Sequence, residues 1–441
     1  MEVIIAGYNK TIDNLNPEII SASYARVSRQ PRTIPEIREE AKKYVEKCRE
    51  SNKNIVFGIG HASIAEHVVF NIDIIGVSRF LVEEIESHRL ASYTEKSQRY
   101  VLFDGDYTIP LELEKDKDIM EYVRIIEKQN DFYKKSYPII LEYFKLKNPE
   151  KYKEQPKTVE GWAKEDARYI ISLATQTQLG MTINARNLEL MIRRLRACPF
   201  LEHKELANRL YEKVYEITPS LFPYTQPSEY EIKTKEKQMY KNAITIPTSD
   251  ITINRNDYIM DFKIAGLLEP KLLTSKETIL NALKGMNLHD SAPREFENVD
   301  FTFTARVSAS CFAQLKRHRM MTLIPMKYTN YERFIIPESI INSGLEKEFN
   351  EIIKDTNSFF NRNEKLFPYV VANSHSRIVF FKINLREMYH FCRMRMDGHA
   401  QWEIRKLAEN MCRLAKEQCP AGMSLCCGKD KFDEVYKEVF G

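Results

Sequence analysis

The 441-residue sequence predicts a protein of mixed helices and short strands whose second half repeats its first. Residues 68–75 alternate apolar and polar side chains, as a half-buried strand does. Residues 77–87 have the apolar stripe of an amphipathic helix, and residues 110–165 are helical in pattern and strongly charged. The tetrapeptide at residues 183–186 recurs with one change at 383–386. We therefore expect one structural unit to occur twice.

The elements of the first half follow from local pattern, with Gly and Pro marking where each one ends. Strand β-propensity and alternation identify short strands, whereas longer amphipathic or charged stretches identify helices. The expected elements are strands at 2–7 and at 68–75, the latter ended by Gly76, helices at 34–51, 77–87, 110–165, from 167 onward and at 182–217, and a loop at 148–157.

The two halves match at two different offsets. His88-Arg89 corresponds to His318-Arg319, an offset of 230, whereas Asn184 corresponds to Asn384, an offset of 200. The second copy therefore lacks roughly thirty residues opposite the charged helices of the first. Residues 225–250 are polar and lack periodicity, which favours a boundary there. We expect copy one to span 1–235 and copy two to span 236–441.

Composition excludes several classes of protein. The hydrophobic fraction of 43% is ample for a core, and a net charge of +4 is not that of a non-specific nucleic-acid binder. The sequence has no apolar run of membrane-spanning length and no signal peptide. Its eight cysteines form no Cys-x-x-Cys pair, which indicates reduced thiols and no zinc site. We expect a cytoplasmic protein without a nucleic-acid or membrane partner.

A polar stretch follows the helix predicted at 77–87 and reads Ser-His-Arg-Leu-Ala-Ser-Tyr-Thr-Glu-Lys-Ser-Gln-Arg-Tyr. The guanidinium of Arg99 and the hydroxyls of Ser92 and Ser97 suit an anion such as phosphate. The carboxylate of Glu95 suits a neutral donor such as a base imide or a ribose hydroxyl. Composition by itself favours a solvated surface loop.

The same stretch resembles the signature of the flavin-dependent thymidylate synthases, Arg-His-Arg-x-x-Ser-x-Asn-x-x-Ser-x-Arg-Tyr. Ser87 replaces the first Arg and Thr94 replaces the Asn. The run that ends at Glu66-His67 resembles a second segment of this family. The resemblance implies an α+β fold, in which each copy forms a small twisted antiparallel sheet against long helices. The signature positions that agree are His88, Arg89, Ser92, Ser97, Arg99 and Tyr100.

Copy two keeps family residues that copy one has lost. Gln314 and the complete Arg317-His318-Arg319 stand where copy one has Glu84 and Ser87. The run His-Ala-Gln-Trp-Glu-Ile at 399–404 also resembles the family, while copy one offers only the weak match at 198–202.

Copy one, in turn, keeps what copy two has lost. The polar loop is missing after Arg319, unless Arg333-Phe334 supplies a shifted version of it. Asn298 replaces His67, and Pro368 stands where copy one has Arg168.

The family resemblance implies a dUMP site built between two subunits, and this complementary loss implies one composite site per chain with a degenerate twin. Among its residues, Ser97, Arg99 and Arg395 are expected to act in catalysis. The expected substrate-binding residues are Gln314, Arg317 and Arg395 from copy two and Glu95, Ser97, Gln98, Arg99 and Arg168 from copy one.

The implied reaction is reductive methylation of dUMP, in which methylenetetrahydrofolate gives the carbon, reduced FAD gives hydride and NADPH reduces the flavin. The protein itself has to position the reactants and stabilise charge. No metal is expected. Asn184 and Asn384 have an alternative role, because either side chain could cap a helix instead of binding the flavin. The expected flavin-binding residues are His67, His88, Arg89, Asn184 and Arg186 from copy one and His318, Arg319, Asn384, Arg386, His390 and His399 from copy two.

The family forms homotetramers, so the resemblance implies that a homodimer of this duplicated chain would rebuild the same assembly. Two other functions stay open at this point. A related flavin enzyme would methylate a different uracil nucleotide or pyrimidine, a question that Gln98, in place of the family's Gly, touches directly. The replacements Ser87 and Asn298 leave open a non-catalytic protein that binds flavin or nucleotide.

Overall fold

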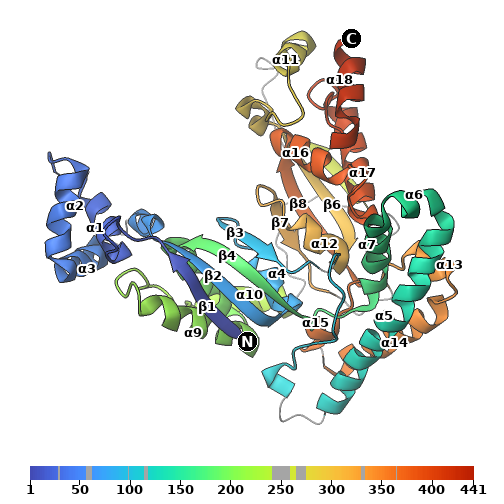
Figure 1. Cartoon of the computed structure of the whole chain (residues 1–441), viewed down its shortest axis with the longest axis horizontal. Helices are drawn as coiled ribbons and strands as arrows, with labels where there is room; N and C mark the ends of the chain where they lie inside the picture. Colours follow the sequence, from blue (N-terminus) through green and yellow to red (C-terminus); the bar gives the residue numbers. More distant parts are fainter. Residues whose placement is uncertain are drawn as a thin grey trace. The chain divides into compact units, whose positions relative to one another are not determined.

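The computed structural model describes residues 1–27, 30–55, 62–97, 99–113, 118–240, 259–264, 275–328, 333–363 and 365–441. Two four-stranded sheets dominate it, with the strand orders β1-β2-β4-β3 and β5-β6-β8-β7 (Figure 1). Every pair of neighbouring strands in both sheets is antiparallel. The repeated sheet order and the surrounding helices confirm the predicted α+β class and its duplication.

The compact units of the chain are not two contiguous halves. Unit 1 consists of residues 1–132, 171–241 and 354–371, and unit 2 consists of residues 133–170, 242–353 and 372–441. Each unit therefore contains the sheet of one copy together with a middle segment of the other copy. The boundary expected between residues 235 and 236 concerns where the copies join and stays a prediction.

The sheet of unit 1 buries an alternating apolar face against the helices that follow its last strand. Phe70, Ile72 and Ile74 are fully buried on β2, and Leu188 and Leu206 meet them in one cluster from α8 and α9. Alternation of period two thus faces a helical stripe of period 3.6. The strands are β1 Glu2–Tyr8, β2 Val69–Ser78, β3 Ala91–Glu95 and β4 Gln176–Asn184, and the principal helices are α1 Pro17–Val27, α4 Arg79–Ile85, α8 Ala185–Ala197 and α9 Leu201–Tyr215.

Unit 2 repeats this arrangement with a more aromatic core. Phe303 of β6 stacks on Phe381 of β8 with ring centroids 5.5 Å apart, and both belong to one buried cluster with Met388 and Ile404. The strands are β5 Ile259–Ile264, β6 Asp300–Ser308, β7 Thr322–Pro325 and β8 Ser376–Asn384, and the helices include α11 Lys276–Leu283, α12 Ala309–Leu315, α16 Leu385–Arg395, α17 Trp402–Gln418 and α18 Phe432–Phe440.

Gly76 accounts for a one-residue change of offset inside the repeated strand. Val69 pairs with Asn184 as Asp300 pairs with Asn384, whereas beyond the glycine the offset between the copies falls from 231 to 230. The register shifts at this glycine, whose φ of +68° suits a β-bulge. The predicted strand end at Gly76 is wrong, because the bulge lets β2 continue to Ser78.

Proline position explains two further corrections. The loop predicted at 148–157 is largely helix α6 Pro149–Glu154, and α7 Pro156–Ala167 follows directly. Both prolines occupy the first turn of a helix, where the missing N–H has no partner to lose. Arg168 therefore follows the end of α7 in a short 3-10 turn and does not open a new helix.

Other predicted helices are shorter than expected. The helix at 34–51 is divided into α2 Ile34–Lys43 and α3 Val45–Lys53 by Tyr44, whose φ of −139° is not helical. The segment predicted to begin a helix at 182 starts as the end of β4, and the helix expected at 77–87 is the shorter α4. The polar stretch from 225 contains helix α10 Glu229–Tyr240, and residues 241–250 lie outside the described part.

The predicted deletion in copy two lies where the sequence placed it. Equivalent β-bridges join Tyr107 to Thr175 and Phe334 to His375, which are 68 and 41 residues apart. Helix α5 Ile119–Lys147 with α6 and α7 fills the longer interval, whereas α13 Glu338–Asn342, α14 Glu346–Arg362 and α15 Phe367–Val370 fill the shorter one.

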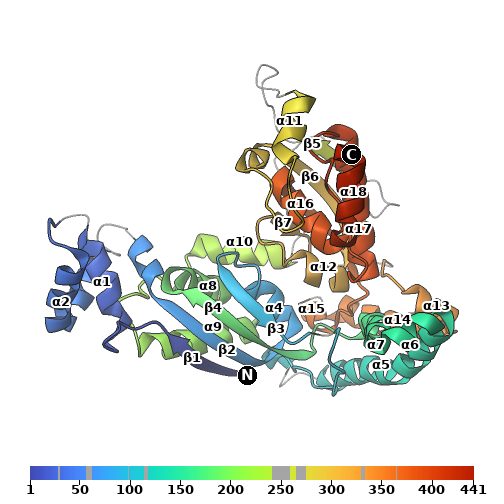
Figure 2. The same ribbon diagram turned by 45° about the horizontal axis from the view of Figure 1, so that its top comes forward.

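Helices α5 and α14 lie side by side (Figures 1 and 2). In unit 1 Gln129 donates to Thr356 over 3.0 Å, and in unit 2 Lys135 contacts Glu348 over 2.6 Å.

Among the described helices, none has both the length and the apolar composition needed to cross a membrane.

Candidate functional site

The stretch that carries the family signature in copy one is partly a strand. Ser92 lies opposite Thr182 within β3, which continues to Glu95. The backbone N–H of Arg99 donates to Ser97 Oγ over 3.2 Å just beyond the strand. A strand end therefore presents Ser97 and Arg99, and the prediction of a loop from residue 92 is wrong. Gln98 lies outside the described residues.

Glu95 is held by an arginine that the sequence did not single out. Arg79 Nη1 lies 2.7 Å from Glu95 Oε1, and the two side chains are 8% and 2% exposed. A buried ion pair of this kind fixes both groups, because removal of either partner leaves a buried charge. Arg79 begins α4, sixteen residues from Glu95, so neither helical nor strand spacing links them in the sequence.

Copy two has lost this polar segment without an insertion. β7 pairs with β8 at the register that β3 has with β4, so Pro325 stands in the place of Glu95. Phe334 bridges His375 just as Tyr107 bridges Thr175. The alternative that Arg333-Phe334 is a shifted version of the signature is therefore wrong.

In unit 2, Arg168 of copy one meets the helix that carries Gln314 of copy two. Arg168 is 6% exposed, and its Nη2 donates to Ser310 Oγ over 2.9 Å. Ser310 and Gln314 are four residues apart on α12 and thus share a helix face. Gln314 is 9% exposed and donates to Gln401 Oε1 over 3.4 Å.

The amide oxygen of Gln314 is buried and has no hydrogen-bond partner among the described residues. Leaving such a group unsatisfied costs about 1–3 kcal/mol. A bound molecule that donates a hydrogen bond would remove this cost, so the position favours a ligand with an N–H or O–H group.

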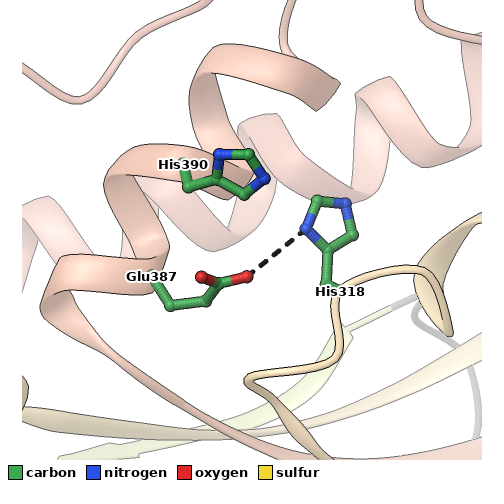
Figure 3. A group of neighbouring side chains, drawn as sticks. All are labelled: His318, Glu387 and His390. Carbon is green, nitrogen blue, oxygen red and sulfur yellow. Dashed lines mark ion pairs between the residues drawn. The ribbon is translucent and has the colours of Figure 1, made fainter. Parts of the chain in front are cut away.

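Arg395, at the end of α16, is held by a buried histidine. Its Nε donates to His318 Nε2 over 2.8 Å, and its Nη2 donates to the carbonyl of Gln314 over 3.2 Å. Since His318 accepts at Nε2, its neutral form carries the proton on Nδ1, which lies 3.5 Å from Glu387 (Figure 3). Burial, then the charges of Arg395 and His390, hold the pKa of His318 well below its usual range.

The group formed by His318, Glu387 and His390 offers three ligand atoms within 4.8 Å of one another (Figure 3). A metal ion there would meet the positive guanidinium of Arg395, which already binds the same imidazole. A metal cation and the guanidinium of Arg395, bound to the same imidazole, would repel each other. We therefore interpret His318 as the imidazole that orients Arg395, with the carboxylate of Glu387 3.5 Å from its other ring nitrogen.

Other predicted ligand-binding residues of copy two are exposed. Arg317 and Arg319 flank buried His318 in the turn after α12, and His390 lies on the exposed side of α16. His399 is 74% exposed in its side chain, and its Nδ1 lies 2.8 Å from Asp397. These side chains can reach a ligand without displacing core residues.

Several predicted flavin-binding residues have structural partners. Asn184 and Asn384 cap α8 and α16, accepting from the N–H of residues 187 and 387 over 2.9 and 2.8 Å. The capping alternative is therefore confirmed for both. Arg386 binds Glu297 over 2.8 Å and also the carbonyl of residue 292. Arg186 makes the equivalent ion pair with Glu66.

The remaining predicted residues of copy one belong to unit 1. His67 is exposed, and its ring centroid lies 4.5 Å from that of Tyr24. His88 is 5% exposed, and burial lowers its pKa to about 4. Arg89 is exposed beside it.

Both copies keep a buried Ser–Glu contact that residue spacing does not reveal. Ser308 donates its N–H and hydroxyl to Glu403 over 2.9 and 2.5 Å, and Ser78 does the same to Glu202 over 2.8 and 2.6 Å. In unit 2 the hydroxyl of Tyr169 also donates to Glu403 over 2.5 Å. The weak match at 198–202 thus contains a true structural equivalent, because Glu202 and Glu403 have the same role.

Asp166 anchors the copy-one segment of unit 2. It accepts hydrogen bonds from Ser339 Oγ over 2.6 Å and from the indole of Trp402 over 2.9 Å. The carboxyl is 4% exposed, and burial raises its pKa to about 7 despite both bonds. The folded protein therefore holds a proton there that the unfolded chain releases near pH 4.

We expect Asp166→Asn to flatten part of the pH dependence of stability. Because the folded-state pKa is raised, wild type loses about 1.4 kcal/mol of unfolding free energy per pH unit between pH 4 and 7 through this group, and little more above pH 7. Relative to wild type, the free energy of unfolding of the Asn variant should therefore rise by roughly 2 kcal/mol between pH 5.5 and 7.5. Urea denaturation at both values measures this, with exposed Asp433→Asn as the control. Equal pH slopes in wild type and Asp166→Asn would contradict it.

Comparison with known proteins agrees with the duplicated fold. A family model described as "Thymidylate synthase complementing protein" matches residues 10–220 and again residues 233–421. A flavin-dependent thymidylate synthase of Clostridium tetani is 36% identical over 217 residues, which cover 48% of this chain and 84% of that protein. The "UPF0159 protein Ta1429" of Thermoplasma acidophilum is 25% identical over 435 residues, covering 84% of this chain and 86% of that protein.

A solved flavin-dependent thymidylate synthase of Helicobacter pylori, complexed with FAD and dUMP, is 23% identical and covers 51% of this chain and all of its own, with a TM-score of 0.33. Because that TM-score is low, the family of this chain is assigned from the family sequence model and the sequence relatives. Because the model matches both copies and most of the chain, the protein belongs to the flavin-dependent thymidylate synthase family.

Proposed function

We propose that the chain methylates dUMP reductively to dTMP as a flavin-dependent thymidylate synthase. The observation that carries this proposal is the group in unit 2 around Gln314. Its buried side-chain amide oxygen has no hydrogen-bond partner among the described residues, and its backbone carbonyl accepts from Arg395. Arg168 contacts the same helix. One amide and two guanidinium groups match the needs of a uracil base and a phosphate.

The residues have distinct tasks in this proposal. Gln314 accepts a hydrogen bond from the base, and Arg395, oriented by His318, stabilises negative charge on the uracil carbonyls. Arg168 and Arg99 bind the phosphate, and Ser97 lies near the base. Arg317 adds a cation at the exposed side of the site. Gln98 is proposed to contact the nucleotide, and Glu95 to position it through its contact with Arg79.

The flavin is proposed to be FAD, which supplies hydride when reduced by NADPH, while methylenetetrahydrofolate supplies the carbon. Exposed Arg319, His390 and His399 have N–H groups that can donate hydrogen bonds to its pyrophosphate. His67, His88 and Arg89 would contribute from copy one, although buried His88 is neutral near pH 7. Asn184, Arg186, Asn384 and Arg386 would act mainly by holding α8 and α16 in place.

Complementation of a thymidine auxotroph tests the function directly. Growth without thymidine, together with dTMP formation by the purified protein, is the expected result. Methylation of UMP instead would favour the related uracil-nucleotide methylase, the alternative that Gln98 keeps open. Binding of dUMP without any methylation would favour a non-catalytic protein.

We predict a homodimer in solution. A duplicated chain would rebuild the four-copy assembly of its family when two chains associate by closed symmetry. Light scattering at micromolar concentration should therefore give twice the 51.8 kDa mass of one chain. A mass of one chain over the same range would contradict this prediction.

A further inference from the structure

In unit 1 the position equivalent to Gln314 is Glu84, and a lysine fills the space beside it. Glu84 is 7% exposed, and its Oε2 lies 2.7 Å from Lys235 Nζ. Lys235 comes from α10, the helix that spans the predicted junction between the copies, and its side chain is 18% exposed. In copy two the side-chain amide oxygen of Gln314 has no hydrogen-bond partner within the part of the chain that the structure describes.

The charge of this place is inverted relative to copy two. The β4 and β8 registers and the caps Asn184 and Asn384 align the two helices at an offset of 200, which places Leu195 where copy two has Arg395. At the offset of 230, Ser87 replaces Arg317. Two arginines are lost and one carboxylate is gained, so the surroundings of Glu84 suit a cation and not a nucleotide.

The surrounding groups leave Glu84 and Lys235 as a buried ion pair. Burial would raise the pKa of Glu84, but Lys235 and then His88 lower it to about 2. His203 is fully buried, and burial lowers its pKa to about 3, so it is neutral near pH 7. Neutral His203 cannot replace the ammonium group of Lys235. Lys235 is therefore needed to neutralise the buried carboxylate of Glu84.

Helix α10 contacts other helices and loops of unit 1 at two further points. Glu231 lies 3.0 Å from Arg193 of α8, and the ring of Tyr240 lies 5.8 Å from that of Phe200. Cys198, between α8 and α9, is fully buried, and burial, then the charge of Glu84, raises the pKa of its thiol. The helix is therefore docked along its length.

We infer that helix α10 closes the copy-one counterpart of the nucleotide site, with Lys235 in the space that a ligand would need beside residue 84. The twin site is then not merely depleted of binding residues but filled by the chain's own connecting helix. The description of this place as a former nucleotide site rests on the proposed function, whereas the closure itself rests on the contacts in unit 1.

Thiol labelling of the full chain tests the closure. N-ethylmaleimide, with peptide mass spectrometry, reports whether Cys198 is protected. Lys235→Ala should increase its labelling rate at least about tenfold, because buried Glu84 loses its partner and α10 opens. Lys233→Ala is the matched control, since this lysine of the same helix is exposed and pairs with exposed Glu229 over 3.2 Å. Equal labelling in the two variants would overturn the inference.

Fully buried Cys392 of unit 2 serves as an internal standard for global unfolding. If Lys235→Ala exposes Cys392 as well, the double variant Glu84→Gln with Lys235→Met decides, because it removes both charges together. Restored protection of Cys198 supports the closure, and continued labelling overturns it. Calorimetry of wild type with dUMP is a separate readout, so failure of nucleotide binding would contradict the proposed function without affecting these results.

Discussion

Arg99→Ala and Arg395→Ala are each expected to abolish measurable dUMP binding, although the two residues belong to different copies. Each guanidinium would make charged hydrogen bonds to the nucleotide, and each such bond contributes about 1.5–3 kcal/mol. The loss of a single bond weakens affinity roughly 10- to 150-fold, and an arginine can lose two at once. Calorimetric titration of the full chain measures both effects.

The same titration counts sites, and we expect one per chain. At the offsets of 230 and 200 the twin has Thr329, Ser87, Pro368 and Leu195 in place of Arg99, Arg317, Arg168 and Arg395, so no arginine of the composite site has a counterpart there. Arg413→Ala, in an exposed pair with Glu417, is the control for loss of a surface charge. Two equivalent sites, or unchanged binding by either arginine variant, would show that the composite site is wrong.

The purified protein is expected to be yellow, and Arg319→Ala and His390→Ala should each lower its flavin content by about tenfold. Both side chains are exposed beside buried His318, where charge-assisted bonds to a pyrophosphate are worth about 1.5–3 kcal/mol each. Heat release followed by chromatography should identify the chromophore as FAD, and absorbance gives its amount per chain.

Arg386→Ala separates flavin contact from helix support. This substitution breaks the ion pair with Glu297, so we expect a lower melting temperature whether or not flavin is lost as well. Arg319→Ala should lower the melting temperature less than Arg386→Ala, because the Arg319 side chain is exposed. A colourless wild-type protein that takes up no added FAD would overturn the flavin assignment.

Local pattern predicted much of this fold because strands and amphipathic helices depend on nearby residues. The alternation at 68–75 marked β2, and the two offsets located a deletion that the bridges at Tyr107 and Phe334 confirm. Boundaries failed where one residue has a special role. Gly76 forms a bulge and lets β2 continue beyond it. Pro149 begins helix α6, whereas the two prolines at residues 149 and 156 suggest a loop.

The candidate site shows the same division. Motif spacing singled out Gln314, His318 and Arg395, and the structure brings them into hydrogen-bond contact in unit 2. Arg79, Glu202 and Lys235 were missed because their partners lie 16, 124 and 151 residues away. Each belongs to a pair buried on folding, and burial is not visible in a list of polar residues.

The sequence by itself determined the family, the duplication and which copy keeps each part of the signature, since these depend on residue identity and spacing alone. Only the tertiary structure decided that residues 133–170 of copy one pack with the sheet of copy two, and that α10 fills the place beside Glu84. The physical reason is that such contacts join apolar faces and buried charges distant in the chain. Many pairings satisfy the same local pattern, and only close packing with every buried charge matched selects one.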